Sequence, residues 1–324
     1  MDEIKQIVYT PAEIGALSKL SIRERLKAKK NGYGLPFPID YVAKDLNQLA
    51  PGDLLTVTGR PGNGKTHLMK WWARKRAEQL AEMEEHNRVV VYVTYEQHIE
   101  DLNNFDLADM TGINLTSIAR CEITDADIEL LDAANVRRHA LPLWSIGHSA
   151  NRRGRRPKMT VDVLADALHG VQTWTGDENG YLIDSVFIDY LQRMPYNGRE
   201  SKAVGISDNL DEIKDLAFAI VAPIVVGVQA KREVDKYDVQ VPGPDDGQWT
   251  SNIEQTSDVN IAVARPSKYR HDGETFGSVV VEGFQQMVMV IWKQKLGIDN
   301  ERHWIMCDPR YNRVSGAQER VTSL

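Results

Sequence analysis

Short runs of consecutive apolar residues recur along this chain of 324 residues, separated by polar and turn-forming segments. An apolar run of about four to eight residues is typical of a strand that is buried on both faces, as the strands of a parallel sheet are. The runs that we interpret as strands are Leu54–Thr58, Val89–Thr94, Leu141–Ile146, Ile183–Ile188, Ile224–Val228, Val259–Ala264, Val288–Trp292 and Trp304–Cys307. The last two of these strands are expected to be antiparallel.

Other stretches repeat their apolar residues with the period of a helix. Spacings of three, four and seven predict an amphipathic helix over about 67–86, with its tryptophans in the core. The residues of this pattern are Met69, Trp72, Ala73, Leu80 and Met83. Further helices are expected at 99–110, 124–139, 161–174 and 209–219, and polar loops at 197–205 and 231–250. Strands that alternate with helices favour an α/β fold, with a mostly parallel sheet flanked by helices.

An amino-terminal arm precedes this core. Thr10, Pro11 and Glu13 have the character of a helix start, with proline at the first helical position and an acid in the first turn. Four apolar residues and a basic run at 23–30 follow, the apolar ones being Ile14, Leu17, Leu20 and Ile22. We assign residues 1–31 to an arm or linker helix, which packs either on its own core or on a neighbouring subunit.

Composition places the chain among ordinary globular proteins. Apolar residues make up 42% and charged residues 26% of it. The formal net charge of −7 means that a nucleic-acid partner would have to be bound by local basic patches. The two cysteines, Cys121 and Cys307, are far apart, so neither a disulfide framework nor a structural metal is indicated. No apolar segment approaches the length of a membrane span, and we expect a cytoplasmic protein.

The strongest chemical signal is the segment GRPGNGKT, which lies between the first predicted strand and the helix at 67–86. This layout is typical of a phosphate-binding loop, in which glycines allow consecutive backbone N–H groups to face the phosphates of a nucleotide. Lys65 would contact the β- and γ-phosphates, and the Thr66 hydroxyl would bind Mg²⁺. The expected ligands of the nucleotide are Gly59, Arg60, Pro61, Gly62, Asn63, Gly64, Lys65 and Thr66.

Three polar residues stand at the carboxyl ends of predicted strands, where ligands collect in open parallel sheets. Asp189 follows the strand at 183–188 and is the expected second Mg²⁺ anchor. Glu96 follows the strand at 89–94 and is the candidate base for a water molecule that attacks the γ-phosphate. Gln229 follows the strand at 224–228 and could sense the γ-phosphate and relay its loss to the next loop.

Six segments, in order and spacing, resemble the ATPase domain of the DnaB family of replicative helicases. They are GRPGNGKT, YVTYEQ, VFIDYLQRM, VVGVQAKRE, SNIEQTSDVNIAVAR and VIWKQKLG. FIDYLQ and IEQTSD are the most telling, because general phosphate-loop chemistry does not require them. The resemblance covers about 32–314 and implies a RecA-like core, a ring that is a hexamer, and ATP bound between neighbouring subunits. We therefore assign 32–316 to the ATPase domain and 317–324 to a carboxyl-terminal tail.

By position, the resemblance implies the same roles for Lys65, Thr66, Asp189, Glu96 and Gln229 as the residues themselves suggest. It also implies that Lys293 and Lys295, in WKQKLG, form a basic finger that enters the site of the next subunit.

The resemblance further implies that the loops after Asp189 and Gln229 face the ring channel. The expected contacts to the phosphate backbone of single-stranded DNA are Arg199, Lys202, Lys231 and Arg232. The basic segment 151–158 lies outside these loops and is either a solvated loop or a second nucleic-acid contact.

The sequence departs from the family in three places. About thirty residues precede the core, so we expect no helical collar and no primase docking through one. Lys295 stands where the family has arginine, and QWTSN lacks the acidic and basic pair expected before IEQ.

We expect an ATP- and Mg²⁺-dependent helicase that forms a homohexameric ring on single-stranded DNA and has a possible loader or partner protein. The alternative is a RecA-like ATPase whose nucleotide state controls its assembly on a partner protein or nucleic acid, without processive unwinding.

Overall fold

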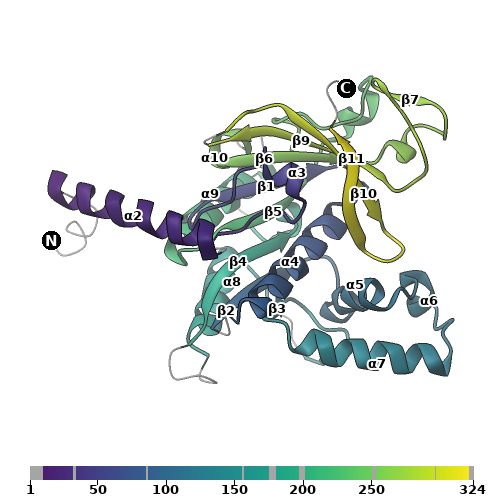
Figure 1. Ribbon diagram of the computed structural model, residues 1–324, viewed down its shortest axis with the longest axis horizontal. Coiled ribbons are helices and arrows are strands. Elements are labelled where there is room, and N and C mark those ends of the chain that lie inside the picture. Colours follow the sequence, from purple (N-terminus) through teal and green to yellow (C-terminus); the bar gives the residue numbers. More distant parts are fainter. Residues whose placement is uncertain are drawn as a thin grey trace.

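The computed structural model describes residues 10–31, 34–84, 87–154, 157–174, 180–196, 201–249, 253–295 and 297–320 (Figure 1). Its centre is a nine-stranded sheet of order β11-β10-β9-β6-β1-β5-β4-β2-β3. The parallel strands are β1 (Leu54–Gly59), β2 (Arg88–Thr94), β3 (Leu143–Ile146), β4 (Leu182–Asp189), β5 (Ile224–Gln229) and β6 (Val259–Ala264). The antiparallel extension consists of β9 (Gln286–Gln294), β10 (Glu301–Asp308) and β11 (Arg313–Arg320).

Helices cover both faces of the parallel part, as expected for this fold class (Figure 1). The helices are α2 (Pro11–Asn31), α3 (Asp40–Ala43), α4 (Lys65–Glu82), α5 (Ile99–Thr111), α6 (Leu115–Ala119), α7 (Asp125–His139), α8 (Val161–Gln172), α9 (Lys202–Ala219) and α10 (Ile253–Thr256). Short 3-10 turns lie at η1 (Leu191–Arg193), η2 (Arg232–Lys236) and η3 (Pro266–Lys268), and a small hairpin joins β7 (Thr275–Phe276) to β8 (Val279–Val280).

The alternation of side chains along the parallel strands places apolar residues in two cores, one on each face of the sheet. Val90 and Tyr92 of β2 pack with α4 on one face, whereas Val89 and Val91 pack with α8 and α9 on the other. Residues i and i+1 of a strand point to opposite faces, so continuous apolar runs are needed where both faces are covered. This requirement explains why the apolar runs located the parallel strands correctly.

Three features differ from the expectations. Helix α9 begins at Lys202, with the Ser201 side chain accepting a hydrogen bond from the Val204 N–H, so 202–205 are helical rather than part of the expected loop. Helix α4 buries charged side chains as well as apolar ones, because oppositely charged groups on α5 and β4 meet them. Strand β11 is not marked by an apolar run, and it continues through 317–320, which the sequence assigns to the tail.

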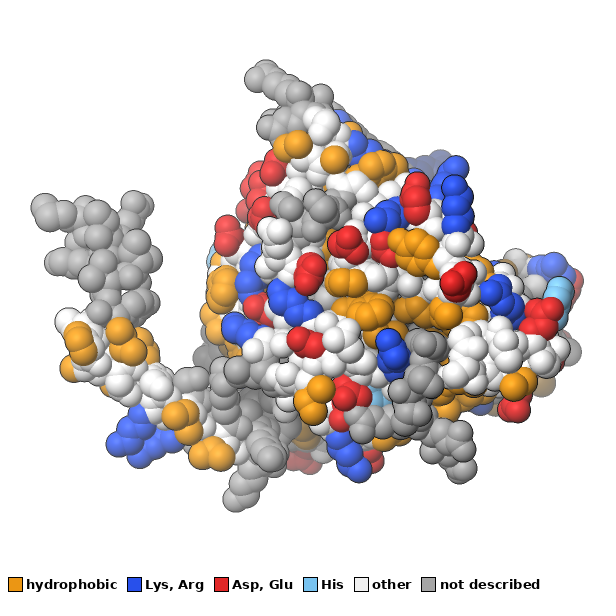
Figure 2. Space-filling model, turned by 90° about the horizontal axis from the view of Figure 1, so that it is seen from above, with side chains coloured by type: hydrophobic (Ala, Val, Ile, Leu, Met, Phe, Trp, Pro, Cys, Tyr) orange, Lys and Arg blue, Asp and Glu red, His pale blue; other side chains and the backbone are white. Residues whose placement is uncertain are grey.

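The amino-terminal arm is helical from Pro11, as expected. Its apolar residues do not pack on the core: Ile14, Leu17, Leu20, Ile22 and Leu26 are about half exposed or more. Figure 2 shows apolar side chains displayed along this arm, to one side of the main body. None of the described helices combines the length and apolar character that crossing a membrane requires.

Candidate nucleotide-binding site

The polar residues expected at the strand ends come together at the carboxyl edge of the sheet. Gly59 at the end of β1 lies opposite Gln229 at the end of β5. Asp189 at the end of β4 lies opposite Thr94, two residues before Glu96. The order β1-β5-β4-β2 therefore brings the phosphate loop, Gln229, Asp189 and Glu96 to one edge.

The phosphate loop turns directly into α4. Gly62 and Gly64 have φ angles of 76° and 89°, in the left-handed region that glycine adopts without strain. Gly64 is the N-cap of α4, so the helix begins at Lys65, two residues earlier than expected. The N–H groups of the first helical turn have no partners within the helix, and with the helix dipole they favour an anion here.

Lys65 is buried and folds back on its own loop. Its Nζ donates a hydrogen bond of 2.7 Å to the carbonyl oxygen of Gly59. Burial lowers the pKa of Lys65 to about 8, although the negative charges of Asp189 and Glu96 oppose this shift. A phosphate at the loop would supply the negative charge that favours the protonated amine.

Asp189 and Thr66 form a pair suited to Mg²⁺. Burial raises the pKa of Asp189, and a hydrogen bond from the Thr66 side chain counteracts that rise. The Asp189 Oδ2 also accepts a hydrogen bond of 3.3 Å from the Tyr92 hydroxyl. Its Oδ1 is buried and has no hydrogen-bond partner among the described residues. A hard cation bound by Thr66 would satisfy this carboxylate oxygen, directly or through water, so the residues fit the ion.

Glu96 differs from Asp189 in being open to solvent. Its side chain is 44% exposed, and Oε1 lies 3.9 Å from an Nη of Arg193. A carboxylate at the rim of the site has access to water, which a candidate for water activation requires.

Gln192 was not assigned a role from the sequence, although it is the last residue of FIDYLQ. Its Oε1 accepts a hydrogen bond of 2.9 Å from the Gln229 N–H. Its Nε2 donates to the carbonyl oxygens of Gln229 and Gln248, at 3.3 and 3.2 Å. The turn after β4 is thereby joined to both ends of the segment that follows β5.

The phosphate loop is also joined to that segment. The Arg60 guanidinium binds both oxygens of Asp235 in η2, at 2.9 and 2.7 Å, and the carbonyl oxygen of Ala230 at 3.2 Å. On its other side, the Asn63 side chain binds the Tyr269 hydroxyl at 2.9 Å and the Arg265 N–H at 2.7 Å. A movement of the phosphate loop would therefore displace η2 and η3 through these bonds.

The candidate finger residues, Lys293 and Lys295, lie beside the ends of the strands that are farthest from the phosphate loop. Gln294 is opposite Val259, which is opposite Leu55, so 293–295 lie beside the start of β1 while the phosphate loop follows its end. The Lys293 amine donates to the carbonyl oxygens of Glu254 and Ser257. Lys295 is 61% exposed, with its Nζ 3.5 Å from Asp258. Neither lysine can reach the phosphate loop of its own chain, because a strand of six residues spans roughly 20 Å.

The expected DNA contacts have different environments. Lys202 is in the first turn of α9, and its Nζ lies 3.6 Å from the centre of the Trp249 ring. Lys231 forms an ion pair of 2.8 Å with Asp246, and Arg232 is exposed at the start of η2. Arg199 lies outside the described residues.

The basic segment 151–158 continues from the carboxyl end of β3. Arg152 and Arg153 are exposed and line a pocket of about 400 Å³, whose floor includes Met159 and Leu164. Arg155 and Arg156 lie outside the described residues.

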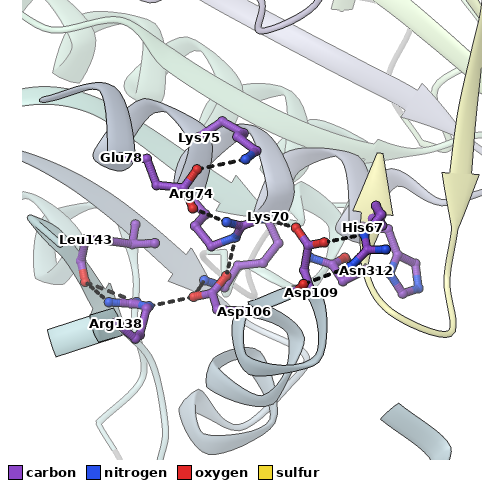
Figure 3. A network of polar contacts seen from close by, with 11 residues as sticks. His67, Lys70, Arg74, Lys75, Glu78, Asp106, Asp109, Arg138, Leu143 and Asn312 are labelled. Carbon is purple, nitrogen blue, oxygen red and sulfur yellow. Dashed lines mark hydrogen bonds and ion pairs between the residues drawn. The ribbon is translucent and has the colours of Figure 1, made fainter. Parts of the chain in front are cut away.

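Behind the phosphate loop, α4 is anchored by a buried ionic network (Figure 3). Lys70 and Asp106 are both fully buried, with 2.5 Å between Nζ and Oδ2. The Arg138 Nε of α7 donates to the same oxygen at 2.7 Å. Arg74 contacts Asp109, which also binds Arg313 of β11 at 2.8 Å. The network links the phosphate-loop helix to α5, α7 and β11.

Comparison with known proteins gives a consistent result. Residues 34–303 match the DnaB-like helicase C terminal domain family. A probable plasmid replicative DNA helicase of Chlamydia trachomatis is 24% identical over 288 residues, which are 84% of this chain and 59% of the relative. The replicative DNA helicase DnaB of Mycoplasma pneumoniae is 22% identical over 278 residues, with 84% and 53% covered. The chain thus spans just over half the length of these relatives.

Two solved structures share the fold. One is an ATPase domain that superposes with a TM-score of 0.73 at 18% identity, covering 94% of this chain and 98% of that one. The other is a DnaB-like replicative helicase, studied with its interactions with primase, which also has a TM-score of 0.73 at 18% identity and covers 93% and 66%. These likenesses confirm the RecA-like α/β architecture that the sequence predicted.

Proposed function

The chain belongs to the family of DnaB-like helicase C-terminal domains, and we propose that it is an Mg²⁺-dependent ATPase that forms a ring and moves along single-stranded DNA. One observation carries this proposal. Lys65, Thr66 and Asp189 lie together where β1 and β4 end, whereas Lys295, the candidate finger residue, is exposed beside the start of β1. A nucleotide site that uses all four of these residues therefore requires a second copy of the chain.

The proposed reaction is attack of water on the γ-phosphorus of ATP, which breaks the bond from that phosphorus to the β,γ-bridging oxygen and releases ADP and phosphate. Bound Mg²⁺ would neutralise charge on the β- and γ-phosphates. When ATP binds, the Lys65 amine leaves the Gly59 carbonyl oxygen and binds phosphate oxygens instead. Its positive charge then stabilises the transition state. Glu96 accepts a proton from the attacking water at a carboxylate oxygen. Gln229 loses its contact to the γ-phosphate when phosphate leaves and passes this change to the segment after β5.

Assembly in a ring is supported by the exposed groups. Lys295 would reach the γ-phosphate of the next subunit, while Lys293 is held by backbone carbonyl oxygens and positions the strand end. The apolar residues of α2 would dock on a neighbour, since they are exposed on their own chain. We propose a hexamer, in line with the family resemblance, that acts in the cytoplasm and is loaded by a partner protein.

The second candidate function is an ATPase whose nucleotide state controls its assembly on a partner without processive unwinding. Lys295 favours it, because an ammonium offers a point charge where arginine offers a planar fork. The engagement of Lys231 by Asp246 also favours it, since this lysine would have to leave a partner before it bound a phosphate.

The two functions are separated by measuring ATP hydrolysis with and without oligo(dT), together with unwinding of a forked duplex. The helicase requires both DNA-stimulated hydrolysis and unwinding. Hydrolysis without stimulation and without unwinding would instead support the second function.

A further inference from the structure

Trp249 has an unusual place for a tryptophan. It is 42% exposed, whereas Trp71, Trp72 and Trp304 are 3%, 0% and 7% exposed in the core. Its ring makes no stacking contact with another aromatic ring among the described residues. The contact that it does make is with a cation, the Lys202 amine, 3.6 Å from the ring centre. An exposed indole of this kind is able to stack on a nucleobase.

The backbone next to Trp249 is fixed close to the nucleotide site. Gln248 donates its N–H to the Gln229 carbonyl oxygen at 2.8 Å, and Gln192 binds the Gln248 carbonyl oxygen at 3.2 Å. Ala230 and Gly247 pair as an isolated antiparallel bridge. Both ends of the segment from Ala230 to Gln248 are therefore held together at the end of β5, one residue before Trp249.

Lys202 contacts Trp249 from a different part of the chain. It occupies the first turn of α9, which follows the turn after β4. The pair therefore joins the two segments that leave the sheet beside Asp189 and Gln229. A planar ring in contact with a cation matches the two parts of a nucleotide, a flat base and an anionic phosphate.

We propose that Trp249 and Lys202 form a binding subsite for one nucleotide of a single strand. The indole stacks on an unpaired base, and the Lys202 amine binds an adjacent phosphate. This proposal rests on the proposed function, since it names the contact through which the ATPase would hold its strand.

The energetics favour replacement of the Lys202 amine by a base at the indole ring of Trp249. An exposed cation–π contact is weaker than the stacking of a base on an aromatic side chain, so a base can compete for the indole. The displaced amine remains within reach of the phosphate chain. Stacking is sequence-tolerant because every base has a π-face, but it requires a base that is not already stacked in a duplex. The subsite therefore selects single strands without selecting sequence.

The test measures binding of labelled oligo(dT) by fluorescence anisotropy, with the full chain and a non-hydrolysable ATP analogue. Trp249→Ala should weaken binding about tenfold, and Trp249→Phe should retain most of the affinity because phenylalanine can still stack. Lys202→Ala should reduce the dependence of log K on log salt by about 0.7, the value for one phosphate contact to a single strand. Binding of oligo(dT) should also quench tryptophan emission in the wild type more than in Trp249→Phe.

Trp174 provides the matched control, because it is also exposed, at 58%, but packs against Trp144 far along the sequence from both segments. Trp174→Ala should bind oligo(dT) like the wild type. Thermal unfolding followed by circular dichroism checks that each variant is folded, and Trp249→Phe carries the test if Trp249→Ala is not. Loss of quenching in Trp249→Phe then supports stacking, and unchanged quenching overturns it.

The outcomes separate the two proposals. If the wild type does not bind oligo(dT) with the nucleotide analogue present, the proposed function itself is wrong. If the wild type binds and folded Trp249→Ala binds equally well, the subsite is overturned while the ATPase proposal stands. Equal weakening for oligo(dT) and for duplex DNA would also contradict stacking on an unpaired base.

Discussion

Gln192 exchanges two hydrogen bonds with the backbone of Gln229, accepting from its N–H at 2.9 Å and donating to its carbonyl oxygen at 3.3 Å. A glutamine amide paired in this way with one residue's backbone holds the end of β5 against the turn after β4. The same amide also binds the Gln248 carbonyl oxygen. The turn after β4 and the proposed DNA-binding segment are thus joined through one side chain.

We predict that Gln192→Ala uncouples nucleotide and DNA. The stimulation of ATP hydrolysis by oligo(dT) should fall to near one, because the turn after β4 loses its bonds to Gln229 and Gln248. Gln192→Glu is the matched control, since it keeps the acceptor for the Gln229 N–H but loses both donated bonds. Its stimulation should lie between those of the alanine variant and the wild type. Full stimulation in Gln192→Ala would show that the amide only contributes to stability.

The pKa of Lys65, about 8, predicts a pH-dependent affinity for ATP. Phosphate binds the protonated amine, so the affinity for an ATP analogue should be constant well below this pKa and fall by up to tenfold per pH unit above it. Isothermal titration calorimetry at a series of pH values measures this dependence. Lys65→Met should bind weakly at every pH, and an equally steep decline in that variant would assign the titration to another group.

Lys65 also makes the stability of the fold depend on pH, in the opposite direction to its effect on the affinity for ATP. The pKa of the unfolded lysine lies near its ordinary value of 10.5 and that of the folded one near 8, so the unfolded chain binds more protons between these values. The contribution of Lys65 to stability therefore rises with pH over this window.

The buried Lys70 and Asp106 pair should be essential to stability. Asp106→Ala leaves the buried amine of Lys70 and the guanidinium of Arg138 without their carboxylate, which costs about 3–5 kcal/mol of unfolding free energy. Urea denaturation followed by circular dichroism measures the loss. The double variant Lys70→Met, Asp106→Leu should recover part of it, because no unpaired lysine charge remains while Arg138 keeps its bonds to the Leu143 carbonyl oxygen. Loss in the double variant as large as in Asp106→Ala would contradict this explanation.

Glu96→Gln should separate binding from hydrolysis. The amide cannot accept the proton of the attacking water, so turnover should fall about 10²- to 10⁴-fold while binding of an ATP analogue is retained. Single-turnover hydrolysis with radiolabelled ATP measures the chemical step. Glu100→Gln, at the start of α5, is the control, because its carboxylate binds Ser149 and Ala150 outside the site. Normal turnover in Glu96→Gln would move the role of base to another residue.

The sequence predicted those features of the fold that depend on local patterns of residues. Apolar runs located the parallel strands, because burial on both faces leaves few polar positions, and the glycines and Lys65 identified the phosphate loop. Helix α9 was placed too far along the chain because glycine and charged residues obscured a start that the Ser201 cap determines. Strand β11 was missed because it pairs with one neighbour at the sheet edge and has no apolar run.

The other features that the sequence did not predict are contacts between residues far apart in the chain. The bonds of Gln192 join residues 37 and 56 positions apart, and Lys70 meets Asp106 36 positions away. No spacing in the sequence marks such a pair, so these contacts required the structure. FIDYLQ was one of the segments that carried the family resemblance, but it did not indicate what Gln192 touches.

The most direct measurement of a site shared between subunits is ATP turnover in mixtures of Lys65→Ala and Lys295→Ala chains. Each variant alone should be nearly inactive, one lacking the phosphate-loop lysine and the other the finger. In randomly mixed rings, roughly a quarter of the interfaces combine an intact loop with an intact finger, since a ring interface joins two different surfaces. We expect turnover in the equimolar mixture to rise well above the sum of the two variants. Turnover no higher than that sum, in mixtures that still assemble, would contradict a site completed in trans.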